Sequence, residues 1–540
     1  MTQAPPARSL AASMTRRETL TALSGLMLGM FVVVLSVTVV ATSLPRIIAD
    51  LRGTQSAYTW VVAASLLAMT VSTPLWGKLA DLYNRKLLLQ LSLALFVLTS
   101  ALAGLSTGTG QLIACRAVQG VAVGGMMAMA TVIIADLLSP RERGRYMGVL
   151  GAFTAAGQVS GPLIGGLITD SIGWRWNFYI GVPLAAVTLL VLQRTLHLPT
   201  RRRERVRIDY PGIVLISGAV SLLLIWVTLA GQQFAWLSTQ TALMLGGAVV
   251  LGAVFLLVER HAAEPVLPLD LFRDRTVVLA VVASVCVGVV SIGAAVFLSQ
   301  YLQLARGKTP TESGLLTLPL VFGTLVASTV AGRLITRTGK WKRYVVAGGV
   351  LLPVGIALMG TLRYNTSWFE VALYMAIVGV GTGLLMQNLV LVVQNVLPVF
   401  QLGVGTSTIT FFRSLGSAAG VSAMGALLAH RVTTLITSDL AKIGVALPEG
   451  RSASTIPDLA TLPPPIRTII ESAYGEGVGD VFLAITPLLL ISLVAVILLP
   501  NRALGDKSGL QLAEEVVGSA GLPADVEGVL DHPRGRREGP

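Results

Sequence analysis

Charged side chains inside long apolar stretches are the residues of this sequence most able to do chemistry. Arg116 lies in the stretch 110–135, three residues before Gln119, and Arg413 lies in the stretch 402–429. An arginine at the centre of a membrane helix costs at least ~2.5–3.5 kcal/mol and usually faces a protein interior with a function. Arg116, Gln119 and Arg413 are therefore candidates for proton coupling or substrate contact. The alternative is a structural arginine satisfied by backbone carbonyls.

Charges at one end of these stretches could form a gate. Asp81 and Arg85 are four residues apart after the second stretch, between Gly77 and Lys86, and Asp136 ends the fourth stretch. Separating a buried ion pair leaves unpaired charge at a cost of roughly 3–5 kcal/mol, so such a pair can hold one face closed. The alternative is a solvated loop whose charges only set the topology.

A glycine motif marks the fifth apolar stretch. Its residues are Gly157, Gly161, Pro162, Gly165 and Gly166. Glycines repeated every four residues stack on one helix face and let a neighbouring helix approach closely. Proline removes a backbone donor and favours a kink. This helix either moves against its partner or forms a tight static contact, and the sequence leaves both open.

Uncharged polar residues within the apolar stretches could line a substrate cavity. They are Ser36, Thr38, Thr42, Gln158, Gln387 and Asn388. Hydroxyls in membrane helices often bond their own backbone instead. The adjacent amides of Gln387 and Asn388 are the most suggestive pair, since two amides are costly in lipid. An apolar cavity with such groups and positive charge suits amphipathic, neutral or anionic compounds as well as cations.

No Asp or Glu lies in the core of any apolar stretch, and all four histidines lie outside the cores. A proton antiporter needs a group that loads on one side and unloads on the other. This absence weakens the cases for proton coupling and for attraction of cationic drugs. The sequence also shows no metal-ligand spacing, Walker loop or nucleophile–base pair. We therefore predict no enzyme, no metal and no cofactor.

Composition places these residues in a membrane protein. The chain has 540 residues, 54% of them hydrophobic and 12% charged, with a mean hydropathy of +0.76. Soluble domains carry about 25% charged residues. The net charge of +13 is explained by basic cytoplasmic loops rather than by nucleic-acid binding.

Fourteen stretches approach the roughly 20 residues that a membrane helix needs. Their approximate bounds are 20–44, 57–77, 87–106, 110–135, 145–169, 176–194, 211–230, 238–258, 276–304, 313–336, 343–361, 370–395, 402–429 and 480–500. If both termini are cytoplasmic, most of the 40 Lys and Arg residues fall on the inner side, as the positive-inside rule requires.

The chain also repeats itself, because the segment 77–86 after the second stretch resembles the segment 332–340 after the tenth. Stretches one to six therefore resemble nine to fourteen, and seven and eight form an insert. The predicted organisation is a cytoplasmic N-terminus (1–19), a six-helix bundle (20–194), a basic loop with two linking helices (195–275), a second six-helix bundle (276–500) with an external loop (430–479), and a disordered cytoplasmic tail (501–540).

With these motifs in order, the chain resembles the major facilitator superfamily, and more closely its fourteen-helix drug:proton antiporters of the EmrB/QacA type. The resemblance covers about residues 20–500 and rests on the segments 35–45, 77–86, 116–120 and 157–166. The sequence departs from the family at Ser36, where an Asp is usual, and at Asn84, where a glycine is usual. Asn tolerates the left-handed backbone that such a turn needs.

The resemblance implies an all-α, multi-pass protein of two six-helix bundles with two linking helices. It implies multidrug efflux by proton antiport and alternating access across a bacterial inner membrane, with a gate role for Asp81, Arg85 and Asp136. The expected partners are small-molecule drugs or lipids, protons and membrane lipids, and the protein is expected to be a monomer. The alternatives are an exporter of one endogenous lipid or metabolite, or a facilitator without proton coupling.

Overall fold

Long apolar helices dominate the described part of the structure, as the predicted stretches lead one to expect. The computed structural model describes residues 16–137, 153, 156–157, 160–161, 163–195, 209–230, 234–235, 237–262, 265, 267–397, 402–442 and 463–502. Within these residues, thirteen helices are long and apolar enough to cross a membrane, and no strand is formed. The fifth predicted stretch is described only in part, and its residues 163–171 are helical. The prediction of an all-α, multi-pass protein is confirmed.

The helices fall into two groups along the chain, separated by a linking pair. The first group is α1 (Arg16–Asp50), α2 (Gln55–Leu82), α3 (Arg85–Gly104), α4 (Thr109–Leu137), α6 (Trp176–Tyr179) and α7 (Gly181–Thr195). Two linking helices follow, α8 (Tyr210–Leu229) and α9 (Thr239–His261), and then a short 3₁₀ helix η2 (Leu269–Arg273). The second group is α10 (Arg275–Gln300), the π-helix η3 (Tyr301–Ala305), α11 (Pro310–Leu316), α12 (Leu318–Thr338), α13 (Lys342–Met359), α14 (Trp368–Val396), α15 (Leu402–Lys442) and α16 (Pro464–Leu498).

Local sequence signals set several helix ends. Thr309 with Glu312, and Ser367 with Glu370, form capping boxes that start α11 and α14, because each side chain satisfies a free amide of the first turn. The structure does not form a left-handed turn at Asn84, where φ is −60°. Instead, the Asn84 side chain caps α3 by accepting from the Lys86 amide at 2.9 Å.

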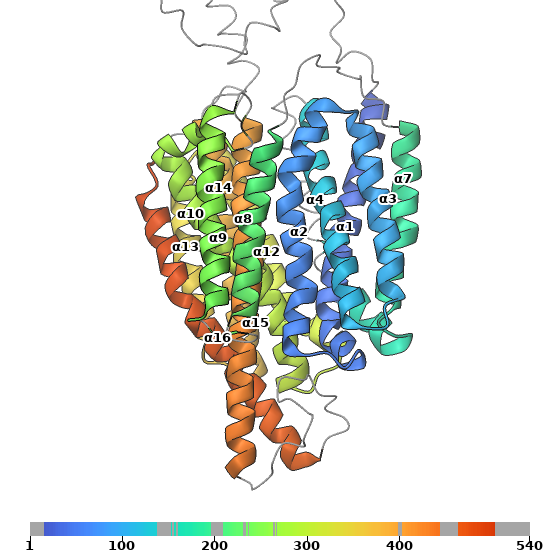
Figure 1. Cartoon of the computed structure of the whole chain (residues 1–540), viewed down its shortest axis with the longest axis vertical. Helices are drawn as coiled ribbons and strands as arrows, with labels where there is room; N and C mark the ends of the chain where they lie inside the picture. The colour runs from blue at the N-terminus through green and yellow to red at the C-terminus, as the bar shows by residue number, and fades with distance from the viewer. Residues whose placement is uncertain are drawn as a thin grey trace, which may run out of the picture.

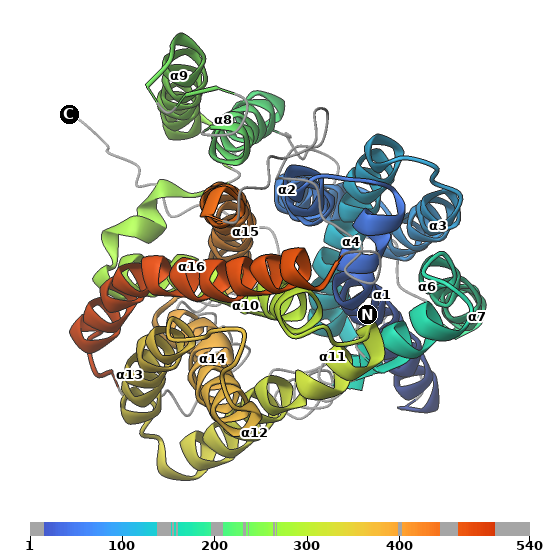
Figure 2. The same cartoon turned by 90° about the horizontal axis from the view of Figure 1, so that it is seen from below.

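The two groups of helices lie side by side with their axes roughly parallel (Figures 1 and 2). Packing within the first group joins α4 to α2 and α3, and α1 to α7; within the second it joins α14 to α12 and α13, and α15 to α10. We call the end of the bundle at which α1 begins the near face, and the opposite end the far face.

The linking helices lie outside both groups. They pack against each other, and α8 also contacts α2 of the first group and α15 of the second. Figure 2 shows the pair at the periphery, beside α2 and α15. Both have exposed apolar side chains, such as Val214 of α8 and Leu243 of α9, as expected for helices that face lipid.

Within the predicted external loop over 430–479, residues 430–442 and 464–479 are helical, whereas a short helix near 466–474 would fit the sequence; whether the segment is external stays a prediction. Helix α15 has 41 residues and α16 has 35, longer than the ~30 Å hydrocarbon core needs at 1.5 Å per residue. Both extend beyond the other helices at the far face (Figure 1). Their extensions carry buried Val432, Ile436 and Leu440, and the ion pair Arg431–Asp480 at 2.7 Å. Polar residues between these apolar positions lower the average hydropathy, so the predicted stretches ended at 429 and began again only at 480.

Several predictions fall outside the described residues. The basic loop lies mostly within 196–208, the tail within 503–540, and the middle of the expected external loop within 443–462. The division into two bundles and a linker at residues 194 and 275 remains a prediction.

Candidate functional site

Hydrogen bonds between the two groups of helices gather at the far face. Gln55 begins α2 and Gln300 ends α10, and their buried amides bond reciprocally, at 2.6 Å and 3.3 Å. Tyr58, one turn further along α2, donates to the Val296 carbonyl at 3.0 Å. Amide pairing of this kind satisfies buried polar groups without charge.

Helix α1 joins this closure through a backbone group. The Thr42 carbonyl accepts from Ser299 Oγ at 3.3 Å and from Gln303 Nε2 at 2.6 Å. Gln303 lies in the π-helix η3, and single π turns often mark functional positions in helices. We call Thr42, Gln55, Tyr58, Ser299, Gln300 and Gln303 the far-face closure. Thr42 was predicted as a cavity residue, and the structure uses its carbonyl at this contact.

The fifth predicted stretch adds a second contact between the groups. Asp170 accepts from the Thr311 amide at 3.1 Å and from the Thr311 hydroxyl, at the start of α11. A Cβ placed on Gly166 would clash with the backbone of Pro310 and Thr311. Gly166 therefore allows the two groups to approach closely at the far face.

The other glycines of the motif face helix α1 within the first group. A Cβ on Gly161 would clash with Thr38 Oγ1, and one on Gly165 would lie 2.9 Å from Val39 Cα. Thr38 Oγ1 donates to the Val34 carbonyl at 2.8 Å and lies 3.2 Å from the Gly157 carbonyl. The structure thus places Gly157, Gly161 and Gly165 in a tight contact with α1. Pro162 and Gln158 lie outside the described residues.

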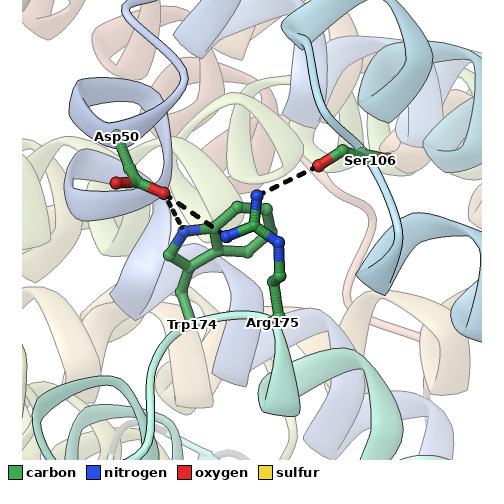
Figure 3. Close-up of polar contacts among 4 residues, drawn as sticks. All are labelled: Asp50, Ser106, Trp174 and Arg175. Atoms are coloured by element: carbon green, nitrogen blue, oxygen red, sulfur yellow. Dashed lines mark hydrogen bonds and ion pairs between the residues drawn. The ribbon is translucent and has the colours of Figure 1, made fainter.

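A polar cluster braces the far end of the first group (Figure 3). Asp50 at the end of α1 accepts from Trp174 Nε1 at 2.8 Å and pairs with Arg175 at 3.5 Å. Arg175 also donates to the Ser106 carbonyl at 3.4 Å and stacks over the Trp174 ring at 4.3 Å. These contacts tie three far-face loops together, so the first group can move as one body.

Arg116 is enclosed by neutral partners. It is 3% exposed on α4, its guanidinium donates to the Gln119 side chain, and its Nε lies 3.4 Å from the Val61 carbonyl on α2. Gln119 in turn donates to Ser100 on α3 at 2.7 Å. The predicted pair Arg116 and Gln119 is therefore brought together, between helices of one group. Its role in proton coupling remains a prediction.

The second arginine within a membrane helix occupies a different environment. Arg413 on α15 is partly exposed, and its guanidinium donates to the Met386 carbonyl of α14 at 3.3 Å. The two adjacent amide side chains of α14 have different environments. Asn388 is buried and donates to the Leu384 carbonyl at 2.6 Å, whereas Gln387 is exposed. Ser36 is buried and lies against Gly181 of α7.

The structure describes only part of the predicted gate at the near face. Gly77 and Asp81 lie in α2 and Asp136 lies in α4, but the side chains of these residues are outside the described set. Lys86 Nζ donates to the Gln193 carbonyl of α7 at 2.7 Å. Arg85 begins α3. The gate pairing of Asp81, Arg85 and Asp136 remains a prediction.

An ion pair joins helix ends at the near face of the second group. Arg502 lies 3.1 Å from Asp274, and its carbonyl accepts from Trp341 Nε1 at 2.7 Å. Burial raises the pKa of Asp274, but hydrogen bonds from Thr276 and the charge of Arg502 outweigh burial and hold that pKa below its ordinary value. Asp274 therefore stays ionised at neutral pH and the pair persists.

Sequence reasoning missed two further features. Glu259, near the end of α9, is 3% exposed and accepts from the Leu267 amide; in the sequence it lies just outside the predicted stretch 238–258. A cavity of about 310 Å³ at the far face is lined by residues that include Tyr301, Arg306 and Trp368. Its walls come from η3, α11 and α14, which the sequence could not assemble.

This geometry can open and close a path between two bodies. The far-face closure consists of amides, hydroxyls and carbonyls, each worth a net ~0.5–1.5 kcal/mol. Breaking it exposes polar groups to water without separating a buried ion pair.

Comparison with known proteins places this geometry among membrane transporters. The family model described as Major Facilitator Superfamily matches residues 26–421. An uncharacterized MFS-type transporter of Mycobacterium tuberculosis is 37% identical over 484 residues, covering 89% of this chain and 70% of the relative. The multidrug transporter protein MdtP of Bacillus subtilis is 34% identical over 432 residues, covering 80% and 79%.

An efflux pump of the fungus Dothistroma septosporum, dotC, is 32% identical over 490 residues and covers 89% of this chain and 83% of the pump. Among solved structures, an inward-facing, occupied bacterial homologue of the lysosomal transporter Spinster aligns with a TM-score of 0.62 at 16% identity, covering 90% and 97%. An auto-inhibited POT family peptide transporter aligns equally well, at 14% identity, covering 90% and 98%. At these identities the solved structures speak for the fold alone.

Proposed function

The chain belongs to the major facilitator superfamily, and from this premise we propose that it is a secondary active multidrug exporter of hydrophobic or amphipathic small molecules. Proton antiport drives the export, and the two groups of helices alternate between opening at the near and far faces. The family and the relatives are transporters, so an enzyme is excluded.

The far-face closure is the observation that supports this mechanism best. It joins α1 and α2 of one group to α10 and η3 of the other, while Asp170 and Thr311 add a contact beside it. A substrate bound between the groups leaves toward the far face only when these bonds break. On this proposal the near face is cytoplasmic, which makes this structure closed to the outside.

The relatives support the direction of transport. MdtP is named a multidrug transporter protein, and dotC is named an efflux pump. On this proposal the chain spans a bacterial inner membrane with both termini in the cytoplasm and acts as a monomer on drugs or lipids. Asp81, Arg85 and Asp136 close the near face when the far-face closure opens.

Proton movement in proteoliposomes tests the proposal. Vesicles with purified protein and a trapped pH dye receive a membrane potential and then a candidate hydrophobic drug. Proton flux that requires the drug supports antiport, because it shows that the movements of drug and proton are coupled. Drug movement without proton flux would contradict antiport and favour a facilitator, which the lack of Asp and Glu in the span cores already makes the second candidate. Movement of one endogenous lipid but of no drug would contradict multidrug export.

A further inference from the structure

Arg413 and Gln387 face each other across the contact between α14 and α15. These helices run antiparallel, and Gln394 Nε2 of α14 donates to Thr406 Oγ1 of α15 at 2.9 Å. Seven residues are two helical turns. Gln387 is seven residues before Gln394, and Arg413 is seven residues after Thr406, so both lie on the facing sides, two turns deeper. The Arg413–Met386 contact at 3.3 Å agrees with this register.

The pair lies deep in the membrane. Helix α15 begins at Leu402, and eleven residues at 1.5 Å per residue place Arg413 about 16 Å from that end. This depth is about the middle of a ~30 Å hydrocarbon core. Neither side chain is buried by the rest of the protein: Arg413 is partly exposed and Gln387 is exposed.

The guanidinium of Arg413 has unused donors. Within the described part of the chain it donates one hydrogen bond, to the Met386 carbonyl, out of five N–H groups. Gln387 makes no side-chain hydrogen bond with another described residue, in contrast to Asn388, which bonds the Leu384 carbonyl. Arg116 differs from Arg413 because a glutamine and a carbonyl enclose it at 3% exposure.

Among the described residues no Asp or Glu forms an ion pair with Arg413, and the sequence places no Asp or Glu in the core of any predicted stretch. A positive charge at this depth attracts an anion. A guanidinium binds carboxylates and other oxyanions through paired N–H groups, and an adjacent amide donates a further bond. Residues around the pair, such as Met386 and Val390, are apolar.

We propose that Arg413 and Gln387 bind the head of an amphipathic anion, and that the protein exports compounds with one carboxylate or similar oxyanion on an apolar body. This inference rests on the proposed export function and narrows its substrate class. It selects anions over the cationic drugs that a buried carboxylate would attract.

Equilibrium binding to the purified full-length protein in lipid nanodiscs tests this inference. The probe is a dansyl-labelled medium-chain fatty acid, compared with its uncharged methyl ester. We expect the wild-type protein to bind the acid at least tenfold more tightly than the ester. Arg413→Gln should weaken acid binding about tenfold and leave ester binding unchanged, while Gln387→Leu should weaken acid binding severalfold. Arg413→Lys should retain part of the affinity, since the charge remains without the paired donors.

Arg343→Gln is the matched control, because Arg343 is an exposed arginine beside the near face and should leave both affinities unchanged. Ester binding also reports whether each variant is folded; where Arg413→Gln does not fold, Arg413→Lys and Gln387→Leu decide. Equal binding of acid and ester by the wild type, or unchanged acid binding in the folded Arg413 and Gln387 variants, would overturn the substrate class. Because no gradient is applied, that result would leave the export proposal standing, whereas the proton-flux assay tests export separately.

Discussion

Buried polar residues in this protein are held mainly by neutral partners. Gln55 and Gln300 bond each other, Arg116 bonds Gln119, and Thr38 bonds backbone carbonyls. A neutral partner satisfies a donor without the large desolvation cost of a second charge. The environment of Arg116 is therefore typical of a structural arginine, and a variant series can separate that role from proton coupling.

Removing Gln119 alone should destabilise the protein more than removing Gln119 together with the charge of Arg116. Gln119→Leu leaves the buried guanidinium without its side-chain acceptor, so we expect a loss of ~1.5–3 kcal/mol in stability. The double variant Arg116→Met with Gln119→Leu removes the charge as well and should melt at a higher temperature than Gln119→Leu alone. Thermal melting in detergent, followed by tryptophan fluorescence, measures both.

The same variants test coupling through proton flux. A double variant that melts below Gln119→Leu would contradict a structural pairing. If the double variant keeps its melting temperature but loses drug-dependent proton flux, Arg116 has a coupling role in addition to its structural one.

Helix ends, rather than helix middles, make the contact between the two groups at the far face. Gln55 starts α2, Gln300 ends α10 and Gln303 lies in the π-helix that follows. Ser299 and Gln303 are four residues apart on one side of this helix end, and both reach the Thr42 carbonyl. Because these groups do not titrate near neutral pH, the closure itself should not respond to pH.

Weakening this closure should open the far face. Gln300→Leu removes both amide bonds to Gln55, worth a net ~1.4 kcal/mol, so the open population should rise about tenfold. The reporter is Thr59→Cys in a background without Cys115 and Cys286, since Thr59 is fully buried where α2 meets Gly425 of α15. The rate of labelling by a membrane-impermeant maleimide measures opening.

We expect this rate to increase to the same extent at pH 6 and pH 8. Gln90→Leu is the matched control, because the Gln90 amide bonds Gln193 within the first group. An unchanged labelling rate in Gln300→Leu would show that the amide pair does not hold the far face closed.

At the scale of the whole molecule, two groups of helices share one interface and a peripheral pair of linking helices. Helix α8 contacts α2 and α15, one from each group, so it can follow both through a movement. The long extensions of α15 and α16 lie on the same side as the far-face closure (Figure 1). The orientation of the chain in the membrane therefore decides which compartment these extensions occupy.

Cysteine labelling of intact cells tests this orientation. Lys442 ends α15 at the far face, and Lys340 lies in the near-face loop between α12 and α13; both are exposed. In the cysteine-free background, Lys442→Cys should react with an impermeant maleimide added outside, and Lys340→Cys should react only after the membrane is permeabilised. The reverse pattern would place both termini outside and contradict an exporter closed toward the exterior.

The sequence by itself determined what local composition and order can determine. Runs of about 20 apolar residues gave the membrane helices, and the family followed from motifs such as Arg116–Gly120. The repeated motifs predict two related groups, and this relation stays a prediction. These features depend on each segment alone, because the bilayer imposes helix formation on any sufficiently long apolar run.

Only the tertiary structure decided which polar groups meet. It placed Thr42 against Ser299 and Gln303, turned the motif glycines toward α1, and buried Glu259. It also joined Gln55 to Gln300, 245 positions apart, and brought the Arg413 guanidinium of α15 to the Met386 carbonyl of α14. A hydrogen bond needs its partners within about 3 Å, and helix packing fixes such positions between segments that the sequence does not connect.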